Sequence, residues 1–214
     1  MKFILGTKQR MTQVFDDNGI VHPATVLKAM PLTVTAFKGV KDEAGEEVYS
    51  SVQLGGGEKN KKNILKAQQG QFGKFGNFSE IIEVRDIEIG ELKTGDKVEV
   101  DTFEVGDTVQ VSAISKGKGF QGVVKRHGFK GGRRTHGNKH HERTPGSIGA
   151  TGPARVFKGV RMAGRMGGER VTIKNLKVLQ IDKDTNTLVL SGAVPGRRGT
   201  LVEIRVVKLQ EKIA

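Results

Sequence analysis

Hydrophobic and polar residues alternate in short runs over most of this chain, with a period of two residues. Two of these runs, Met11–Phe15 and Val21–Lys28, flank the four residues Asp16–Gly19, which end in an Asn-Gly step. Asn and Gly both tolerate positive φ, so such a step between alternating runs indicates a β-hairpin. The pattern therefore predicts an N-terminal hairpin in a body made mainly of β-strands.

The same pattern recurs further along the chain. Runs rich in β-forming residues at Val34–Phe37 and Val48–Val52 are separated by a charged turn at Lys41–Glu47. Gly95–Val100 is then repeated eleven residues later as Gly106–Val111, and each copy predicts a Gly-Asp turn that leads into an alternating strand. Strands of this length and spacing predict a small β-barrel or sandwich.

One stretch of the body does not have a strand pattern. Asn60–Phe78 contains three phenylalanines spaced by three residues, with glycines between them, and it predicts one or two short helices. Several lysines lie in or beside it, and they either contact phosphate or form a solvated face. These are Lys59, Lys61, Lys62, Lys66 and Lys74.

The alternation stops in Lys116–Arg170, where no period of 2 or 3.6 residues persists and where 14 of the 30 glycines lie. It resumes at Val171–Ile181, and further strands are expected at Leu188–Leu190 and Val202–Val206. We therefore expect a discontinuous β body, residues 1–115 and 171–214, interrupted by an irregular extension, residues 116–170. Such a segment buries too little apolar surface to be ordered without a partner.

The extension also holds nearly all of the net charge. It contains fourteen lysines and arginines but only Glu142 and Glu169 as acids, which is +12 of the formal +13 of the chain. A protein gains affinity for nucleic acids by releasing the counterions condensed on their phosphates, so this polarisation implies a polyanionic partner. Because the run is internal and flanked by strands, a solvated tail is a poorer explanation.

Two apparent enzymatic motifs in the extension do not have the required context. Gly117–Gly122 matches the dinucleotide fingerprint G-x-G-x-x-G, but no amphipathic helix is expected after it, and in the region of a ribose-binding acid Glu142 is embedded among cations. His136 and His140 have the spacing of zinc ligands on a helix, but Gly137 lies between them and the chain has no cysteine. We expect no metal, no nucleotide cofactor and no catalytic residues.

RNA is the expected partner. The sequence has no helix-turn-helix, zinc-finger or basic-zipper pattern, and the extension has few aromatic residues for stacking single strands. A glycine-rich, arginine-rich strand is suited to thread between the helices of a folded RNA. The side chains expected to bind RNA are Lys116, Lys118, Lys125, Arg126, His127, Lys130, Arg133, Arg134, His136, Lys139, His140, Arg143, Arg155, Lys158, Arg161, Arg165 and Arg170.

The absence of cysteine, of a signal-peptide core and of any run of 18 apolar residues predicts a cytoplasmic protein without a membrane segment.

Motifs across essentially the whole chain resemble the bacterial form of the L-three family of large-subunit ribosomal proteins. These motifs are Gly6-x-Lys8, Arg10–Thr12, Ser115–Arg126, Thr135–Asn138, Pro145–Gly149, Val156–Gly159, Met162–Gly164, Met166–Gly167 and Gly192–Gly196.

The resemblance implies a barrel like those of translation factors and an extension that runs through 23S rRNA toward the peptidyl transferase centre. It implies binding early in assembly, beside large-subunit proteins of the fourteen and nineteen families, with no catalysis, no small-molecule substrate and no cofactor other than magnesium ions that accompany rRNA. The glycine-rich stretch between Pro145 and Pro153 is the expected tip near that centre. The tip residues are Gly146, Ser147, Ile148, Gly149, Ala150, Thr151 and Gly152.

Three positions depart from the family pattern. Gln110 replaces an acid or asparagine, Arg10 replaces a glycine where the first strand begins, and Ala150 replaces a glutamine that some bacterial members methylate.

Two other functions are alternatives to a ribosomal protein. One is a regulatory protein that binds DNA or non-ribosomal RNA, and the other is an RNA-processing enzyme, which an excess-substrate assay would reveal.

Overall fold

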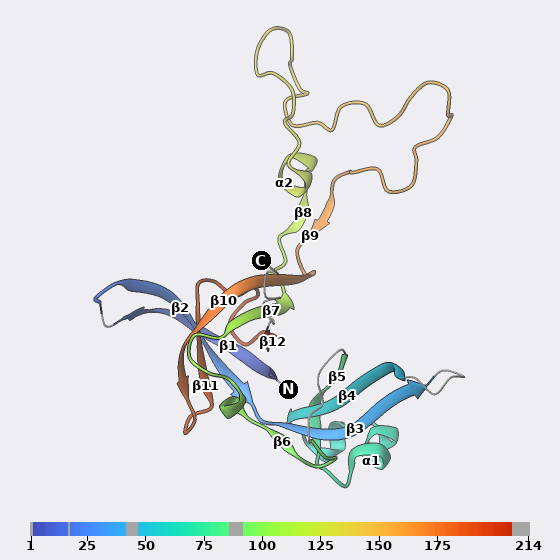
Figure 1. Ribbon diagram of the computed structural model, residues 1–214. Coiled ribbons are helices and arrows are strands. Elements are labelled where there is room, and N and C mark those ends of the chain that lie inside the picture. Colours follow the sequence, from blue (N-terminus) through green and yellow to red (C-terminus); the bar gives the residue numbers. More distant parts are fainter. Residues whose placement is uncertain (1, 17, 42–46, 86–91, 207–214) are drawn as a thin grey trace. The chain divides into compact units, whose positions relative to one another are not determined.

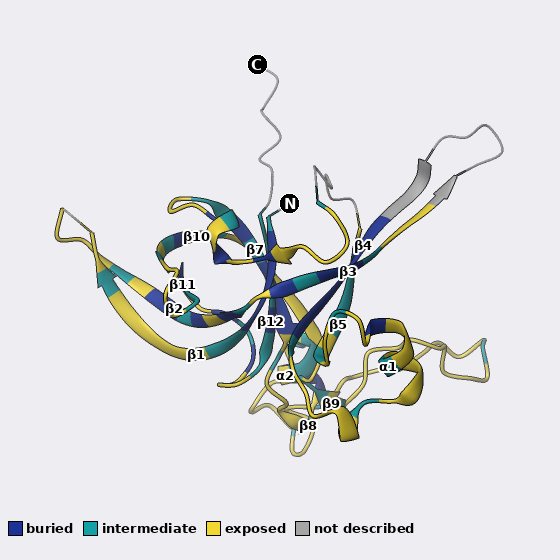
Figure 2. Ribbon diagram, turned by 90° about the horizontal axis from the view of Figure 1, so that it is seen from below, coloured by how far each residue is buried: buried dark blue, intermediate teal, exposed yellow. Residues whose placement is uncertain are grey.

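The computed structural model describes residues 2–16, 18–41, 47–85 and 92–206. The chain divides into two compact units, of which the first comprises Met1–Ile114 with Val171–Ala214 and the second Ser115–Arg170 (Figure 1). Strands predominate and helices are few and short, which confirms the mainly β fold. Most buried residues lie on the strands of the first unit, whereas the loops of the second are largely exposed (Figure 2).

A closed barrel forms the centre of the first unit. Its strands follow the order β1-β12-β7-β10-β11-β2. The bounds are β1 (Phe3–Phe15), β2 (Val21–Met30), β7 (Thr108–Ile114), β10 (Arg170–Asp182), β11 (Thr187–Ser191) and β12 (Leu201–Val206). Because β12 pairs antiparallel with both β1 and β7, strands from the two ends of the chain close the barrel.

The alternation seen in the sequence fills the barrel interior. Successive side chains of a strand point to opposite faces, and in β12 it is Val202 and Ile204 that are fully buried. Val111 of β7 and Leu188 of β11 are fully buried in the same core. The predicted strands at both ends of the chain are therefore confirmed, and their apolar faces meet inside the barrel.

Truncating one of these side chains is expected to destabilise the protein. Ile204→Ala removes a fully buried side chain and should lower the free energy of unfolding by about 2–5 kcal/mol, measured by urea denaturation. Ile114→Ala is the matched control, because the side chain of Ile114 is 51% exposed at the end of β7. Equal losses for the two variants would contradict the assignment of Ile204 to the core.

The N-terminal hairpin is also confirmed, and it is longer than predicted. β1 and β2 pair antiparallel from Leu5–Met30 to Phe15–Val21, and Gly19 closes the turn with φ +75°. Asp17 lies outside the described residues. The register shifts between Lys8 and Arg10, so the pairing of the two strands is irregular there.

A second sheet of four strands packs in the same unit. Its order is β5-β4-β3-β6, with β3 (Leu32–Lys41), β4 (Glu47–Glu58), β5 (Phe78–Arg85) and β6 (Lys97–Val98). The strands predicted at 34–37 and 48–52 are confirmed, whereas residues 42–46 of the turn between them lie outside the described residues. Leu32, Val34, Val52 and Leu54 belong to one core cluster with the barrel residues.

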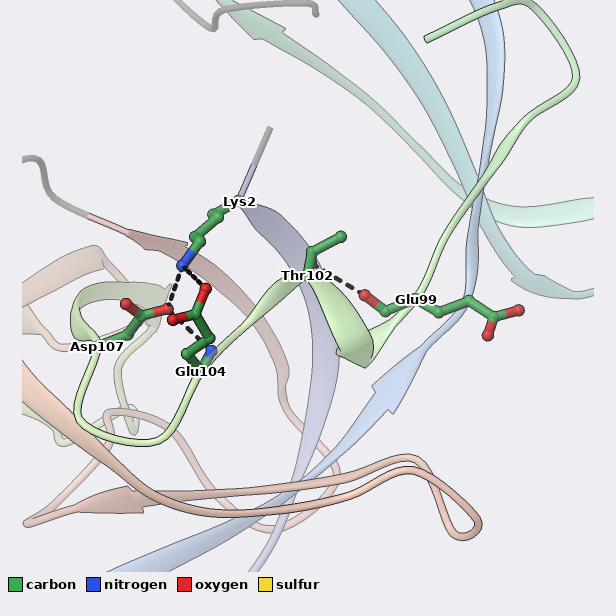
Figure 3. Close-up of polar contacts among 5 residues, drawn as sticks. All are labelled: Lys2, Glu99, Thr102, Glu104 and Asp107. Atoms are coloured by element: carbon green, nitrogen blue, oxygen red, sulfur yellow. Dashed lines mark hydrogen bonds and ion pairs between the residues drawn. The ribbon is translucent and has the colours of Figure 1, made fainter. Parts of the chain in front are cut away.

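The prediction of an alternating strand at Gly95–Val100 is wrong in its extent. β6 has only two residues, and the 3₁₀ helix η2 (Val100–Thr102) follows at once. The Thr102 hydroxyl donates to the carbonyl oxygen of Glu99 at 3.0 Å (Figure 3). Val100 and Phe103, three residues apart, are both buried. This is the spacing of a 3₁₀ turn, so burial of Phe103 overrides the strand pattern.

The second Gly-Asp turn leads into β7 as predicted. Lys2 Nζ donates to Asp107 Oδ2 at 2.9 Å and to Glu104 Oε1 at 3.1 Å (Figure 3). Asp107 Oδ2 also accepts the backbone N–H of Glu104. The hydrogen bond to Asp107 is the main cause that raises the pKa of Lys2. This network ties the start of β1 to the turn before β7.

The predicted helical insert is confirmed. It contains the 3₁₀ helix η1 (Lys61–Asn63) and the helix α1 (Lys66–Phe72). Gln69 Nε2 donates to the carbonyl oxygens of Lys61 and Ile64, and it thereby joins the two helices. Phe72 anchors the insert because its side chain is buried.

Candidate nucleic-acid interface

A short stem begins the second unit, Ser115–Arg170. Strands β8 (Gly119–Gln121) and β9 (Gly164–Met166) pair antiparallel. Below them, the backbone N–H of Ser115 donates to Glu169 O at 2.8 Å, and that of Lys118 donates to Met166 O at 2.9 Å. Gly167 has φ +77°, and a Cβ at this position would collide with the carbonyl oxygen of Lys116. Only glycine permits these two segments of the stem to approach so closely.

A helix of only five residues follows the stem, directly after Gly117–Gly122, where the sequence predicts no amphipathic helix. α2 (Val123–His127) has five residues, buries Val123 and ends at Gly128, which has φ +72°. Lys125, Arg126 and His127 occupy its last turn, where positive charge is favourable. An apolar pair of only Val123 and Val124 is too short to produce a recognisable helical period.

Two loops leave this stem and helix (Figure 1). The first spans residues 131–142 and is closed by the backbone N–H of Gly132, which donates to Glu142 O at 2.9 Å. Arg134 Nε forms an ion pair with Glu142 Oε1 at 2.9 Å, and this hydrogen bond raises the pKa of Arg134. Asn138 Nδ2 donates to the Arg133 carbonyl across the same loop. Glu142, one of the two acids of this unit, therefore holds the loop together.

The second loop spans residues 143–162. Its return is fixed by Met162, whose carbonyl oxygen accepts Arg126 Nη1 at 2.8 Å and lies 3.0 Å from His127 Nε2. The segment expected as the tip, Pro145–Pro153, lies in this loop, and all of its residues from Gly146 to Gly152 are exposed. The Ser147 hydroxyl donates to Gly149 O at 2.8 Å, and the Arg155 guanidinium lies 5.9 Å from the ring centroid of Phe157.

Most of the cations in this unit face solvent. All fourteen lysines and arginines are exposed except Arg126, which is half-buried. His136, with φ +60°, and His140 are also exposed. Many of the cations form no ion pair or side-chain hydrogen bond within the described residues. These are Lys116, Lys118, Lys125, Lys130, Arg133, Lys139, Arg143, Lys158, Arg161 and Arg165.

The structure thus places the predicted RNA-binding side chains on one small scaffold and leaves the charges of the ten cations named above available for an external anion. Sequence reasoning missed the glycines that make this scaffold, Gly131, Gly132 and Gly167, at which a side chain would collide with backbone or with Asn138. The Gly-Gly pairs at 131–132 and 167–168 were the available signal. In the described part of the chain, no cluster of side chains is suited to hold a metal ion, and no helix is long and apolar enough to cross a membrane.

Comparison with known proteins adds the decisive observation. The model of the family described as Ribosomal protein L3 matches residues 50–188, which include the whole of Ser115–Arg170. The chain belongs to the ribosomal protein L3 family. L3 relatives also match over nearly the full length of the chain. The large ribosomal subunit protein uL3 of Bacillus thuringiensis (strain Al Hakam) is 45% identical over 206 residues, 95% of this chain and 96% of that protein.

A second L3 relative agrees with the first. The large ribosomal subunit protein uL3 of Bacillus cytotoxicus is 44% identical over 206 residues and covers the same shares of the two chains. The match to L3 proteins therefore extends over both units, the barrel as well as the cationic loops.

Proposed function

We propose that this chain is a structural constituent of the large ribosomal subunit and that Ser115–Arg170 binds 23S rRNA. The observation that carries the proposal is the set of exposed cations that have no partner among the described residues, displayed on loops with little core of their own. The names of the L3 relatives support the assignment to the large subunit. The protein would act in the ribosome, in the cytoplasm.

The extension would act by charge and shape rather than by chemistry. Exposed lysines and arginines replace the counterions around packed RNA helices, and glycine-rich backbone lets amide groups approach phosphates closely. Binding at many phosphates suits a protein that joins the subunit early and holds rRNA in place. In this role the chain would lie beside large-subunit proteins of the fourteen and nineteen families and near magnesium ions bound to the rRNA. The role requires no acid, base or nucleophile.

The second loop is proposed to reach toward the peptidyl transferase centre with Gly146–Gly152 at its tip. These residues are exposed and most of them are small, and a Cβ on Gly146 or on Gly152 would meet nothing within 4 Å. Arg143 and Arg155 flank the segment and are suited to fix it between phosphates. The tip would then position rRNA as a wedge.

Gly149→Asp tests this tip. A Cβ at position 149 meets only Arg155 O, at 4.0 Å, so the free protein should keep its stability. In the ribosome the carboxylate would lie among phosphates, and we expect slower subunit maturation or altered drug protection of the peptidyl transferase rRNA. Gly149→Asn has nearly the same shape without the charge and is the control. Normal maturation and unchanged drug protection with Gly149→Asp would show that Gly146–Gly152 is not the tip.

Sedimentation tests the assignment as a whole. Tagged protein expressed in bacteria should sediment with the large subunit through a sucrose gradient and should remain there after a wash at moderate salt. Protein found only at the top of the gradient would contradict the proposal. The same purified protein, mixed with excess RNA, should leave that RNA intact.

A further inference from the structure

A groove on the first unit lies beside the helical insert. It has a volume of about 830 Å³ and is lined by the end of β2, the start of β3, the end of β4, β6 and the last residues of the insert. Its lining includes Lys28, Lys59 and Lys97 together with Phe75 and Phe78. This size falls within the range of pockets that hold small organic groups.

The groove has a cationic rim. Lys28, Lys59 and Lys97 are exposed, and within the described residues their ammonium groups have no ion pair and no hydrogen bond. Glu58 is the one acid among the residues that line the groove. The insert adds more lysines, and the sequence from Lys59 to Ser79 contains no acid at all. These additional lysines, all exposed, are Lys61, Lys62, Lys66 and Lys74.

Two aromatic rings lie among these lysines, and each ring lies against a glycine. A Cβ on Gly55 would collide with the ring of Phe78, so that ring lies directly on the backbone of β4. Phe75 lies beside Gly95, where a Cβ would be 3.8 Å from the ring. Both phenylalanines are only half-buried, unlike Phe72, which is buried in the insert. The Phe78 ring is therefore held against β4, and part of each ring remains accessible.

We propose that this groove binds a single-stranded RNA segment, with a base against Phe75 and Phe78 and its phosphates on Lys28, Lys59 and Lys97. Lysines around a fixed aromatic surface are the usual elements of single-strand recognition, because every base has a π face and every linkage a negative charge. An acidic peptide would satisfy the lysines but leave the rings unused. All residues that line the groove belong to the first unit, and none belongs to the extension. This inference rests on the proposed function only in that the partner is RNA.

Photo-crosslinking of the full-length protein tests the groove directly. The probe is a single-stranded oligouridine that contains 4-thiouridine, and the crosslinked peptides are identified by mass spectrometry. We expect crosslinks at Phe75 or Phe78 in addition to crosslinks within Ser115–Arg170. Crosslinks confined to the extension would overturn the groove and leave the proposed function intact. Crosslinks at the groove without any in the extension would contradict the proposed function and leave the groove intact.

Substitutions measure the two parts of the groove separately. Phe75→Leu should weaken binding of the same probe about 5- to 100-fold, the range for losing one stacked base. Lys59→Gln with Lys97→Gln should reduce the slope of log affinity against log salt by about 1.4, since each phosphate contact on a single strand contributes about 0.7.

The matched control is Lys174→Gln with Lys177→Gln, which removes the same charge from exposed positions on β10. Circular dichroism melts of all variants show whether the fold is kept. The proposal fails if a folded Phe75→Leu protein binds the probe normally. It also fails if the β10 variant changes the salt slope as much as the groove variant does.

Discussion

Raising the salt concentration from 50 to 200 mM is expected to weaken binding to 23S rRNA by roughly 10³- to 10⁵-fold. This estimate follows if about 6–10 of the fourteen cations in Ser115–Arg170 contact phosphates, because each contact releases counterions. The exposure of these side chains, and the small number of acids beside them, leaves enough free charge for that number. Filter binding or fluorescence anisotropy at constant magnesium concentration measures the slope.

Duplex DNA at matched salt is the control for this experiment. A protein suited to folded rRNA should bind rRNA fragments more tightly than duplex DNA at every salt concentration, whereas a regulatory DNA-binding protein should show the opposite order. A response to salt that is nearly flat would contradict an electrostatic interface of any kind.

Replacing Lys116–Glu169 by a short Gly-Ser linker is expected to leave a folded protein that is not incorporated into ribosomes. The barrel core contains no residue from that segment. β7 and β10 are neighbours in the barrel, and Ser112 Oγ lies 2.7 Å from Thr172 Oγ1, so a short linker can join the two strands. Thermal denaturation followed by circular dichroism should remain cooperative, because the cost of closing a loop changes slowly with its length.

A second variant separates charge from chain length in this experiment. Changing the lysines and arginines of the extension to glutamine keeps its length and its glycines, and it should abolish incorporation as the linker does. If the linker variant lost its cooperative transition, the extension would have to contribute to the core. If either variant were incorporated normally, the extension would not be the main rRNA-binding element.

The sequence predicted those parts of the fold that depend on local pattern. The hairpin turn at Gly19 and the alternating strands β7, β11 and β12 follow from turn chemistry and period-2 burial, which act within a few residues. The second sheet was not foreseen as a separate sheet, because alternation does not state which strands pair. Strand β6 is shorter than predicted, because the chain turns after two residues and Phe103 is buried beyond the turn.

The candidate interface was predictable in composition but not in shape. Charge and glycine content single out Ser115–Arg170, since both are properties of the residues themselves. The division into two loops depends on Glu142, Arg126 and Met162 forming contacts across many residues, which no local pattern encodes. The groove beside Phe75 likewise requires the ends of several strands to meet.

Closure of the barrel by β1 and β12 has a consequence for the order of events during synthesis. Phe3 pairs with Arg205 and Thr7 with Leu201, so β1 has no partner on that side until β12 has been synthesised. The cationic loops emerge earlier, because they lie between β7 and β10. A nascent chain therefore presents its polycationic segment to surrounding RNA before its body has a finished core. Contacts so distant in sequence also form slowly, so the proposed binding of RNA by these loops would have a kinetic lead over completion of the fold.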